Sequence, residues 1–226
     1  MKIGIFGTGM VGRTLAERLI SDGHEIMIGT RNVENTLANT KPDVIGTPPY
    51  KEWQVNNKTV ELGTFSEAAK FGEVVFISTF GDVAINAIDL AGKENLDGKV
   101  VIDTTNPLDL SNGIPPSFGG AIGNSLGEQI QNRLPNAKVV KAFNTLSMHI
   151  VVNPQREEGY PVLMVAGNDN EAKAKVTEIA KGWGWKDIMD LGVIGEAFYM
   201  ESFALMWIRY AFHNNSWSHA FSFLRK

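Results

Sequence analysis

A glycine-rich turn between an apolar run and a helical pattern most constrains the fold of this chain. Residues 2–6 form a short run rich in Ile, which is typical of a buried strand, and residues 7–12 read G-T-G-M-V-G. Apolar residues then recur at helical spacing over residues 15–20, and a second apolar run covers residues 25–28. The order strand, glycine turn, helix, strand predicts a right-handed βαβ unit.

Each glycine of this turn has a physical role in a dinucleotide site. Gly7 permits the tight turn, Gly9 lets the backbone approach a diphosphate, and Gly12 lets the helix pack close to the strand. The helix N-terminus then offers free N–H groups and partial positive charge to the anion. The alternative is a tight turn without a ligand. We expect cofactor contacts from the whole loop, namely Gly7, Thr8, Gly9, Met10, Val11 and Gly12.

The end of the second strand indicates which dinucleotide is expected. An NAD site usually has Asp or Glu there to bind the ribose 2′-OH, whereas this chain has Gly29 followed by Thr30, Arg31 and Asn32. Arg31 can hold a 2′-phosphate with two charge-assisted hydrogen bonds, and Thr30 and Asn32 can add further donors. We therefore predict NADP rather than NAD. The alternative is that Arg31 is an ordinary solvated charge.

Composition excludes several classes of protein. The 226 residues carry a net charge of −4 without basic tracts, which argues against nucleic acid as a main partner. The absence of cysteine excludes disulfides, thiolate metal sites and cysteine nucleophiles, and we expect no bound metal. No apolar stretch is long enough to span a bilayer, and the N-terminus has no signal-peptide pattern. We expect a cytoplasmic protein without a membrane partner.

Later strands are expected to bring polar ends to the same edge of the sheet. We predict strands over residues 60–63, 73–78, 98–103 and 138–143. In doubly wound sheets ligands bind beyond the carboxyl ends of the strands. Phe80 there could shield one face of a nicotinamide ring, or be an ordinary core contact. Asn106 could bind the carboxamide or close an Asx turn. The cofactor candidates at these ends are Thr79, Phe80, Gly81, Thr105, Asn106 and Asn144.

The alternation of elements predicts an α/β, Rossmann-type doubly wound and mainly parallel sheet. We expect an NADP-binding domain over residues 1–150 and a smaller α/β part over residues 151–226 that ends in a buried helix at residues 196–215. Residues 42–58 lack periodicity and are interpreted as packing over the sheet edge, with a substrate lid as the alternative. Ser66 is expected to cap the helix after the third strand, and Ser125 the helix at residues 125–134.

With these elements in place, the chain resembles the NADP-dependent oxidoreductases that use the deazaflavin coenzyme F-420. The resemblance rests on residues 3–12, on G-T-R-N at 29–32, on V-I-D-T-T-N-P at 101–107 and on V-V-K-A-F-N-T at 139–145. It implies that Thr8, Thr30 and Arg31 flank the phosphates of NADP. It also implies a C-terminal part that closes over the site and supports a homodimer. The cytoplasmic domain of STEAP-type metalloreductases is similar, but this chain lacks their membrane helices.

The resemblance implies hydride transfer between NADPH and a flavin-like or deazaflavin acceptor, with F-420 or a flavin as the second substrate. Such a transfer depends more on proximity than on an acid or base. Two alternatives stay open: an NADPH-dependent reductase of a small carbonyl or imine, with His149 as a weak candidate proton donor, and a non-catalytic NADP sensor. Lys141 is expected to reach the surface or an ion pair. Glu201 is expected to face the site or an interface.

Overall fold

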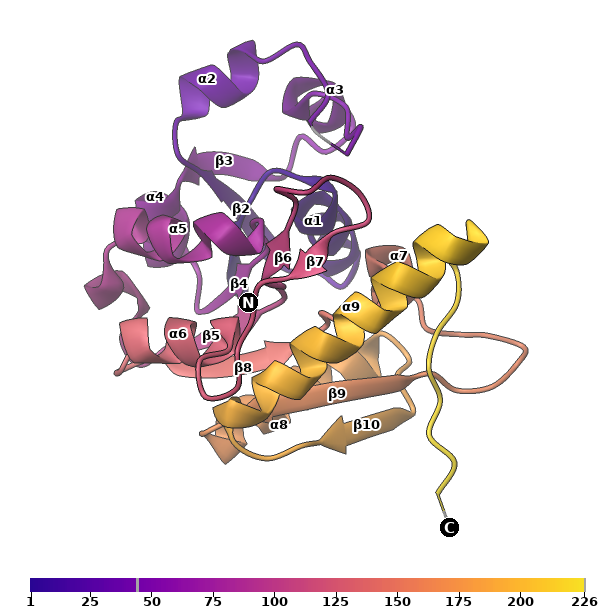
Figure 1. Ribbon diagram of the computed structural model, residues 1–226. Coiled ribbons are helices and arrows are strands. Elements are labelled where there is room, and N and C mark those ends of the chain that lie inside the picture. The colour runs from indigo at the N-terminus through magenta and orange to yellow at the C-terminus, as the bar shows by residue number, and fades with distance from the viewer. Residues whose placement is uncertain (44, 226) are drawn as a thin grey trace.

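An eight-stranded sheet forms the centre of the molecule in a computed structural model that describes residues 1–43 and 45–225 (Figure 1). Its strand order is β10-β9-β8-β5-β4-β1-β2-β3, and all neighbours are parallel except β8 and β9. The predicted doubly wound, mainly parallel α/β fold is confirmed. The strands of this sheet are β1 (Lys2–Phe6), β2 (Glu25–Thr30), β3 (Glu61–Thr64), β4 (Val74–Ile77), β5 (Val100–Asp103), β8 (Lys138–Ala142), β9 (Val162–Gly167) and β10 (Asp187–Asp190).

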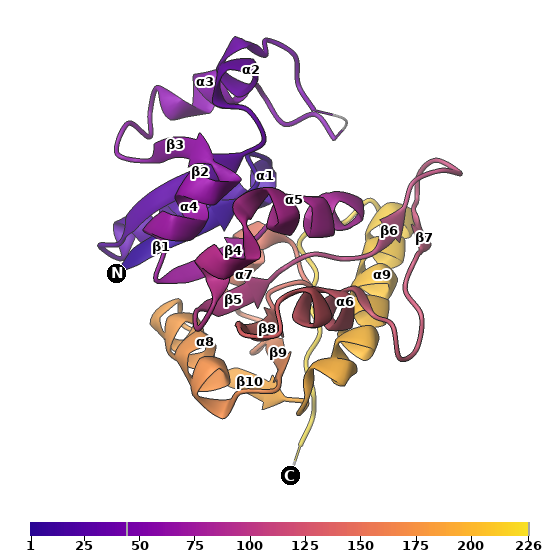
Figure 2. The ribbon, with the colours of Figure 1, turned by 90° about the vertical axis from the view of Figure 1, so that its left-hand side faces the viewer.

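Helices cover both faces of the sheet (Figure 2). One face packs against α1 (Met10–Ser21), α7 (Met148–Val152) and α8 (Asn170–Gly182). The other packs against α4 (Phe65–Phe71), α5 (Ala84–Ala91) and α6 (Leu126–Arg133). The remaining elements are α2 (Val33–Ala38), α3 (Tyr50–Gln54), α9 (Ala197–Asn214), the hairpin β6 (Leu108–Asp109) and β7 (Ser117–Phe118), and three 3-10 turns, η1 (Gly81–Val83), η2 (Lys93–Leu96) and η3 (Ile194–Glu196).

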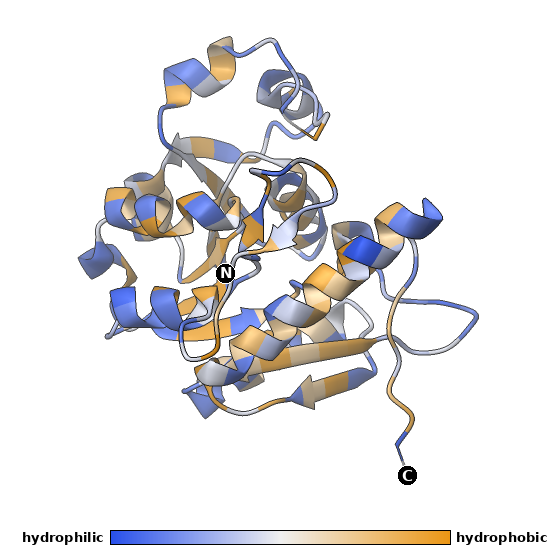
Figure 3. Ribbon diagram, viewed as in Figure 1, coloured by the Kyte–Doolittle hydropathy of each residue, from blue (hydrophilic) through white to orange (hydrophobic). Residues whose placement is uncertain are grey.

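The central strands are apolar throughout because both of their faces are buried. In β4, Val74 and Phe76 enter the core on the α1 side, whereas Val75 and Ile77 enter the core on the α4 side. Figure 3 shows the resulting hydrophobic colour along the central strands, while helices such as α2 and α6 carry much hydrophilic colour and α9 carries both. The continuous apolar runs of the sequence therefore mark strands that are buried on both sides.

Capping residues explain where two of the helices begin. The prediction that Ser66 caps α4 is wrong: Thr64 is the cap, and it forms a reciprocal capping box with Glu67. The Thr64 side chain accepts from the Glu67 N–H, and the Glu67 carboxylate accepts from the Thr64 N–H at 2.7 Å. A Thr followed three residues later by Glu carries this signature, whereas Ser66 has no Glu or Gln at that spacing. The predicted cap of α6 by Ser125 is confirmed, with Glu128 completing its box.

The C-terminal part continues the same sheet. Strand β9 runs antiparallel to β8, and β10 extends the sheet parallel to β9. The expectation of a helix that is buried on most sides is too strong for α9. Met200, Ala204, Trp207 and Ala211 form its buried stripe, while another side is exposed. The domain boundary near residue 150 stays a prediction.

None of the helices in the described part of the chain combines the length and the hydropathy needed to cross a membrane.

Candidate functional site

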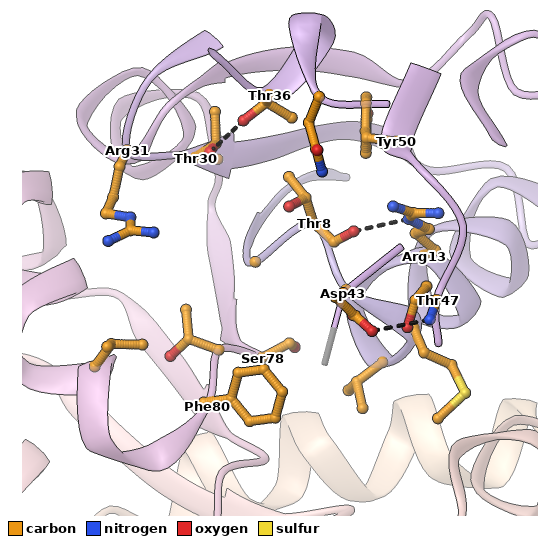
Figure 4. A pocket seen from close by; sticks show the side chains of 18 of the residues that line it. Thr8, Arg13, Thr30, Arg31, Thr36, Asp43, Thr47, Tyr50, Ser78 and Phe80 are labelled. Carbon is orange, nitrogen blue, oxygen red and sulfur yellow. Dashed lines mark hydrogen bonds between the residues drawn. The ribbon is translucent and has the colours of Figure 1, made fainter. Parts of the chain in front are cut away.

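A cavity of about 770 Å³ opens where β1, β2 and β4 end (Figure 4). It runs past the glycine loop between the end of β2 and the segment that follows β4. This is the edge of the sheet at which the sequence predicts cofactor binding. Ten predicted residues line it: Gly7, Thr8, Gly9, Met10, Val11, Thr30, Arg31, Asn32, Thr79 and Phe80.

The glycine loop has the geometry of a diphosphate cradle. Gly7 has a φ of +120°, and a Cβ there would lie 2.7 Å from the Ser78 carbonyl oxygen. A Cβ on Gly12 would overlap the Gly7 carbonyl oxygen, so Gly12 permits close packing and does not line the cavity. At Gly9 the nearest atom to a Cβ is 4.0 Å away. That atom is Asp43 Oδ2. No side chain caps the N-terminus of α1, so its N–H groups and its partial positive charge are available to an anion.

The end of β2 supplies polar and cationic groups to one end of the cavity. The Thr30 and Thr36 hydroxyls are 2.8 Å apart, and Asn32 caps α2 by accepting from the Asn35 N–H at 2.7 Å. The side-chain carbonyl oxygen of Asn32 therefore already accepts a hydrogen bond within the protein. Arg31 is exposed on the cavity wall and forms no ion pair with any other described residue. Its guanidinium points into the cavity in Figure 4.

Arg13 is a cavity residue that the sequence reasoning missed. Its Nε donates to the Thr8 carbonyl and its Nη1 to the Pro48 carbonyl, both at 2.7 Å. The guanidinium also lies 5.5 Å from the centre of the Tyr50 ring. Burial lowers the pKa of Arg13 from its ordinary value, but a guanidinium stays charged in proteins. The helix dipole disfavours a cation in the first turn of a helix. The position of Arg13 in the sequence was therefore the feature from which its role in the cavity could have been predicted.

The segment at residues 42–58 does more than pack over the sheet edge. Tyr50 joins the core on the α1 side, as the packing interpretation expects. Asp43, Ile45, Thr47 and Pro48 of the same segment line the cavity opposite the glycine loop. The segment therefore forms a wall of the cavity in addition to the packing that was expected of it, and the substrate lid stays a prediction.

The polar ends of β5 and β8 meet behind the turn that carries Phe80. The Asn106 side chain donates to the Asn144 carbonyl, and the Asn144 side chain donates to Asn106 Oδ1, both at 2.9 Å. A Cβ on Gly81 would overlap the Asn106 carbonyl oxygen. Asn106, Asn144, Thr105 and Gly81 do not line the cavity. Asn144 Oδ1 is buried without a hydrogen-bond partner among the described residues.

A buried ion network stands next to these strand ends. Lys141 Nζ donates to Asp103 Oδ2 at 2.8 Å and to the Thr105 carbonyl at 2.6 Å. It also lies 2.9 Å from Glu201 Oε1, and all three charged side chains are fully buried. Burial by itself lowers the pKa of Lys141, but the carboxylates of Asp103 and Glu201 raise it overall. The ammonium is therefore charged at neutral pH.

The network settles the roles of Lys141 and Glu201. Lys141 reaches an ion pair, which was one of its two expected roles. The expectation that Glu201 faces the site or an interface is wrong, because its carboxylate is buried and accepts from the N–H groups of Leu126 and Gly127 at the start of α6. The helix N-terminus stabilises the second negative charge.

His149 is placed away from the cavity. It is exposed on α7, and its Nε2 lies 3.3 Å from the Ser147 hydroxyl. It does not line the cavity, so its role as a proton donor stays a prediction without structural support. Among the described residues, no group of three or more His, Asp or Glu side chains could hold a metal ion.

This chain is similar to known NADP oxidoreductases. A family described as "NADP oxidoreductase, coenzyme F-420-dependent" matches residues 2–107. The crystal structure of a protein proposed to be an F-420-dependent NADP reductase from Arthrobacter sp. FB24 is 40% identical, with a TM-score of 0.93 and all of both chains covered.

Two further similarities are more distant. Metalloreductase STEAP3 of Rattus norvegicus is 28% identical over 204 residues, which are 90% of this chain and 36% of that protein. The chain thus spans about a third of the length of the curated relatives it matches. A reductive aminase from Aspergillus terreus, with NADPH bound, is 13% identical at a TM-score of 0.63, covering 95% of this chain and 62% of the other. This last likeness shows the fold alone.

Proposed function

Because this chain belongs to the family of coenzyme F-420-dependent NADP oxidoreductases, we propose that it transfers a hydride between NADP(H) and a flavin-like or deazaflavin ring. The cavity is the observation that supports this most strongly. On one side it reaches the N-terminus of α1, which no side chain caps. On the other side it reaches the end of β2, where the lining is cationic and includes no carboxylate. The bound nucleotide supplies the hydride, and the protein supplies orientation and electrostatics.

The residues present fit the phosphates of NADP. Gly9 has no side chain, so the backbone can approach a diphosphate at the N-terminus of α1, and Arg13 stands in the first turn of that helix. Arg31 can bind the 2′-phosphate, with the Thr30 and Thr36 hydroxyls beside it. These groups bind the nucleotide and hold it against the ends of β1 and β4.

The character of the remaining wall favours a planar acceptor. Met10 and Phe80 line the cavity with 51% and 47% of their surfaces exposed, so they offer open apolar contacts to a ring. Reduction of a carbonyl needs a proton donor at the product oxygen. His149, the proton donor considered from the sequence, does not line the cavity. A reduced flavin-like ring can instead take its proton from solvent at an exposed edge.

Anaerobic mixing with NADPH distinguishes the candidate functions. We expect NADPH oxidation in the presence of F-420 or a free flavin and no turnover with small carbonyl compounds or imines. The loss of the nicotinamide absorbance, measured for each acceptor at equal concentration, gives the comparison.

Each other result of this assay identifies a different function. Turnover only with a carbonyl or imine would contradict the proposal and favour a metabolite reductase. Tight NADPH binding without turnover of any acceptor would favour a sensor. A protein without NADPH binding would overturn the assignment of the cavity itself.

We also propose that the chain forms a homodimer through α9. Tyr199, Met206 and Tyr210 lie on one side of this helix, with 58%, 48% and 51% of their surfaces exposed. An apolar stripe of this kind on a free surface is typical of an interaction site. The family resemblance favours a second copy of the chain as its partner.

Charge introduced into this stripe is expected to separate the two copies. We expect the wild-type protein to sediment as a dimer at micromolar concentration and Met206→Arg to sediment as a monomer. Arg209→Ala is a control on the same helix that removes no apolar surface from the stripe. A monomeric wild-type protein would contradict the proposal.

A further inference from the structure

The charges that line the cavity are unevenly distributed. Among the described residues, the lining includes three cationic side chains, those of Arg13, Arg31 and Lys41, and a single carboxylate, that of Asp43. Cations are expected in a site for phosphates. The carboxylate is not expected there, because it repels the same ligand.

Asp43 stands where the diphosphate is expected. Its Oδ2 is the atom found 4.0 Å from the position of a Cβ on Gly9. The second glycine of this motif lacks a side chain so that the backbone can approach the diphosphate. The direction of the missing Cβ therefore points to the diphosphate position, and the carboxylate lies beside it.

The two oxygens of Asp43 have different surroundings. Oδ1 accepts from the Ile45 N–H at 3.0 Å and from the Thr47 N–H at 2.8 Å, and the two bonds hold the side chain in place. Figure 4 shows the bond to Thr47. Oδ2 accepts no hydrogen bond from a described residue. Oδ2 thus faces the glycine loop without a hydrogen-bond donor among the described residues, and the nearby cation is the Arg13 guanidinium.

The N-terminus of α1, behind the glycine loop, favours an anion beside Gly9. No acidic residue occupies the first turn of α1, no side chain caps it, and Arg13 adds positive charge. The Asp43 carboxylate experiences this attraction in the nucleotide-free protein. A diphosphate that enters must replace it or accept its repulsion.

We propose that Asp43 is a built-in competitor for the diphosphate, which lowers the affinity for NADP(H) and speeds its release. The proposal rests on the proposed NADP site and adds a residue that opposes binding there. An oxidoreductase must exchange its nucleotide in every turnover, and a like charge beside the diphosphate increases the dissociation rate. The competing role for Asp43 is to accept hydrogen bonds from a ribose hydroxyl, which would increase affinity.

Asp43→Asn tests the proposal because it removes the charge and keeps the oxygen that accepts from Ile45 and Thr47. We expect the Kd for NADPH to fall about tenfold and the dissociation rate, measured by stopped-flow displacement, to fall in parallel. Asp82→Asn is the matched control: the same substitution at an exposed residue near the cavity that does not line it. We expect that variant to bind NADPH like the wild type.

A second ligand separates this proposal from the assignment of the site. Adenosine 2′-phosphate lacks the diphosphate, so its Kd should be equal in wild type and Asp43→Asn, whereas inorganic pyrophosphate should compete more strongly for the variant. Unchanged or weaker NADPH binding by Asp43→Asn would overturn the role of Asp43 alone. A wild-type protein that binds neither NADPH nor adenosine 2′-phosphate would overturn the NADP site as well.

Discussion

Replacing Lys141 by Met is expected to lower the free energy of unfolding by about 3–5 kcal/mol, because it leaves two buried carboxylates without their cation. Asp103 and Glu201 are both fully buried, and Lys141 is the cation in contact with each. Glu201 keeps its two N–H donors at the start of α6, and Asp103 keeps the N–H and the hydroxyl of Thr105 as donors. The expected loss therefore comes from the two buried negative charges that remain without a cation. A loss of this size is a large part of the total stability of a typical domain.

Lys138→Met provides a matched control on the same strand. Lys138 also faces two carboxylates, at 3.2 Å from Asp169 and 3.3 Å from Glu171, but its side chain is 35% exposed. Solvent screens such pairs, so this variant should lose about 1 kcal/mol or less. Urea unfolding monitored by tryptophan fluorescence compares the two. Equal losses would contradict the importance of the buried network.

The second large effect is expected at Arg31. Replacing it by Ala should weaken NADPH binding by about 10- to 150-fold, because a hydrogen bond to a charged group contributes about 1.5–3 kcal/mol. NADH lacks the 2′-phosphate, so its affinity should remain nearly the same. The preference for NADPH should therefore be reduced or lost. Titration of nicotinamide fluorescence with both nucleotides gives the ratio.

The structure makes this prediction specific. Arg31 is exposed on the cavity wall and has no carboxylate partner among the described residues, so its charge is available to a ligand. Arg31→Lys keeps the charge but loses the planar fork, and an intermediate preference is expected. If the preference is the same in wild type and Arg31→Ala, Lys41 on the same cavity wall becomes the candidate for binding the 2′-phosphate.

The features predicted correctly from the sequence depend on short stretches of chain. The central strands were recognisable because burial on both faces leaves a continuous apolar run, as in β4. The glycine loop was recognisable because backbone sterics at Gly7 and Gly12 exclude a side chain. The residues at the ends of β1, β2 and β4 follow those elements directly, so their position on one edge of the sheet was predictable too.

The features that were missed depend on contacts between distant segments. Lys141 meets Glu201, 60 positions further along the chain, because α9 packs against α6, and no local sequence pattern indicates that contact. Arg13 donates to Pro48, and Asp43 approaches Gly9, because an irregular segment returns to the glycine loop. The hydropathy of α9 indicated burial, but it could not show that one side remains exposed.

The doubly wound sheet, the glycine loop at the start of α1 and the cation after β2 could be predicted from the amino-acid sequence, because each follows from local sterics, hydropathy and charge. The polar groups that share the cavity, the charges that are buried together and the exposed side of α9 became known only from the packing of the folded chain. These features depend on how segments that are far apart in the chain pack together. The contacts of a side chain are made with those segments, and its neighbours in the sequence do not specify them.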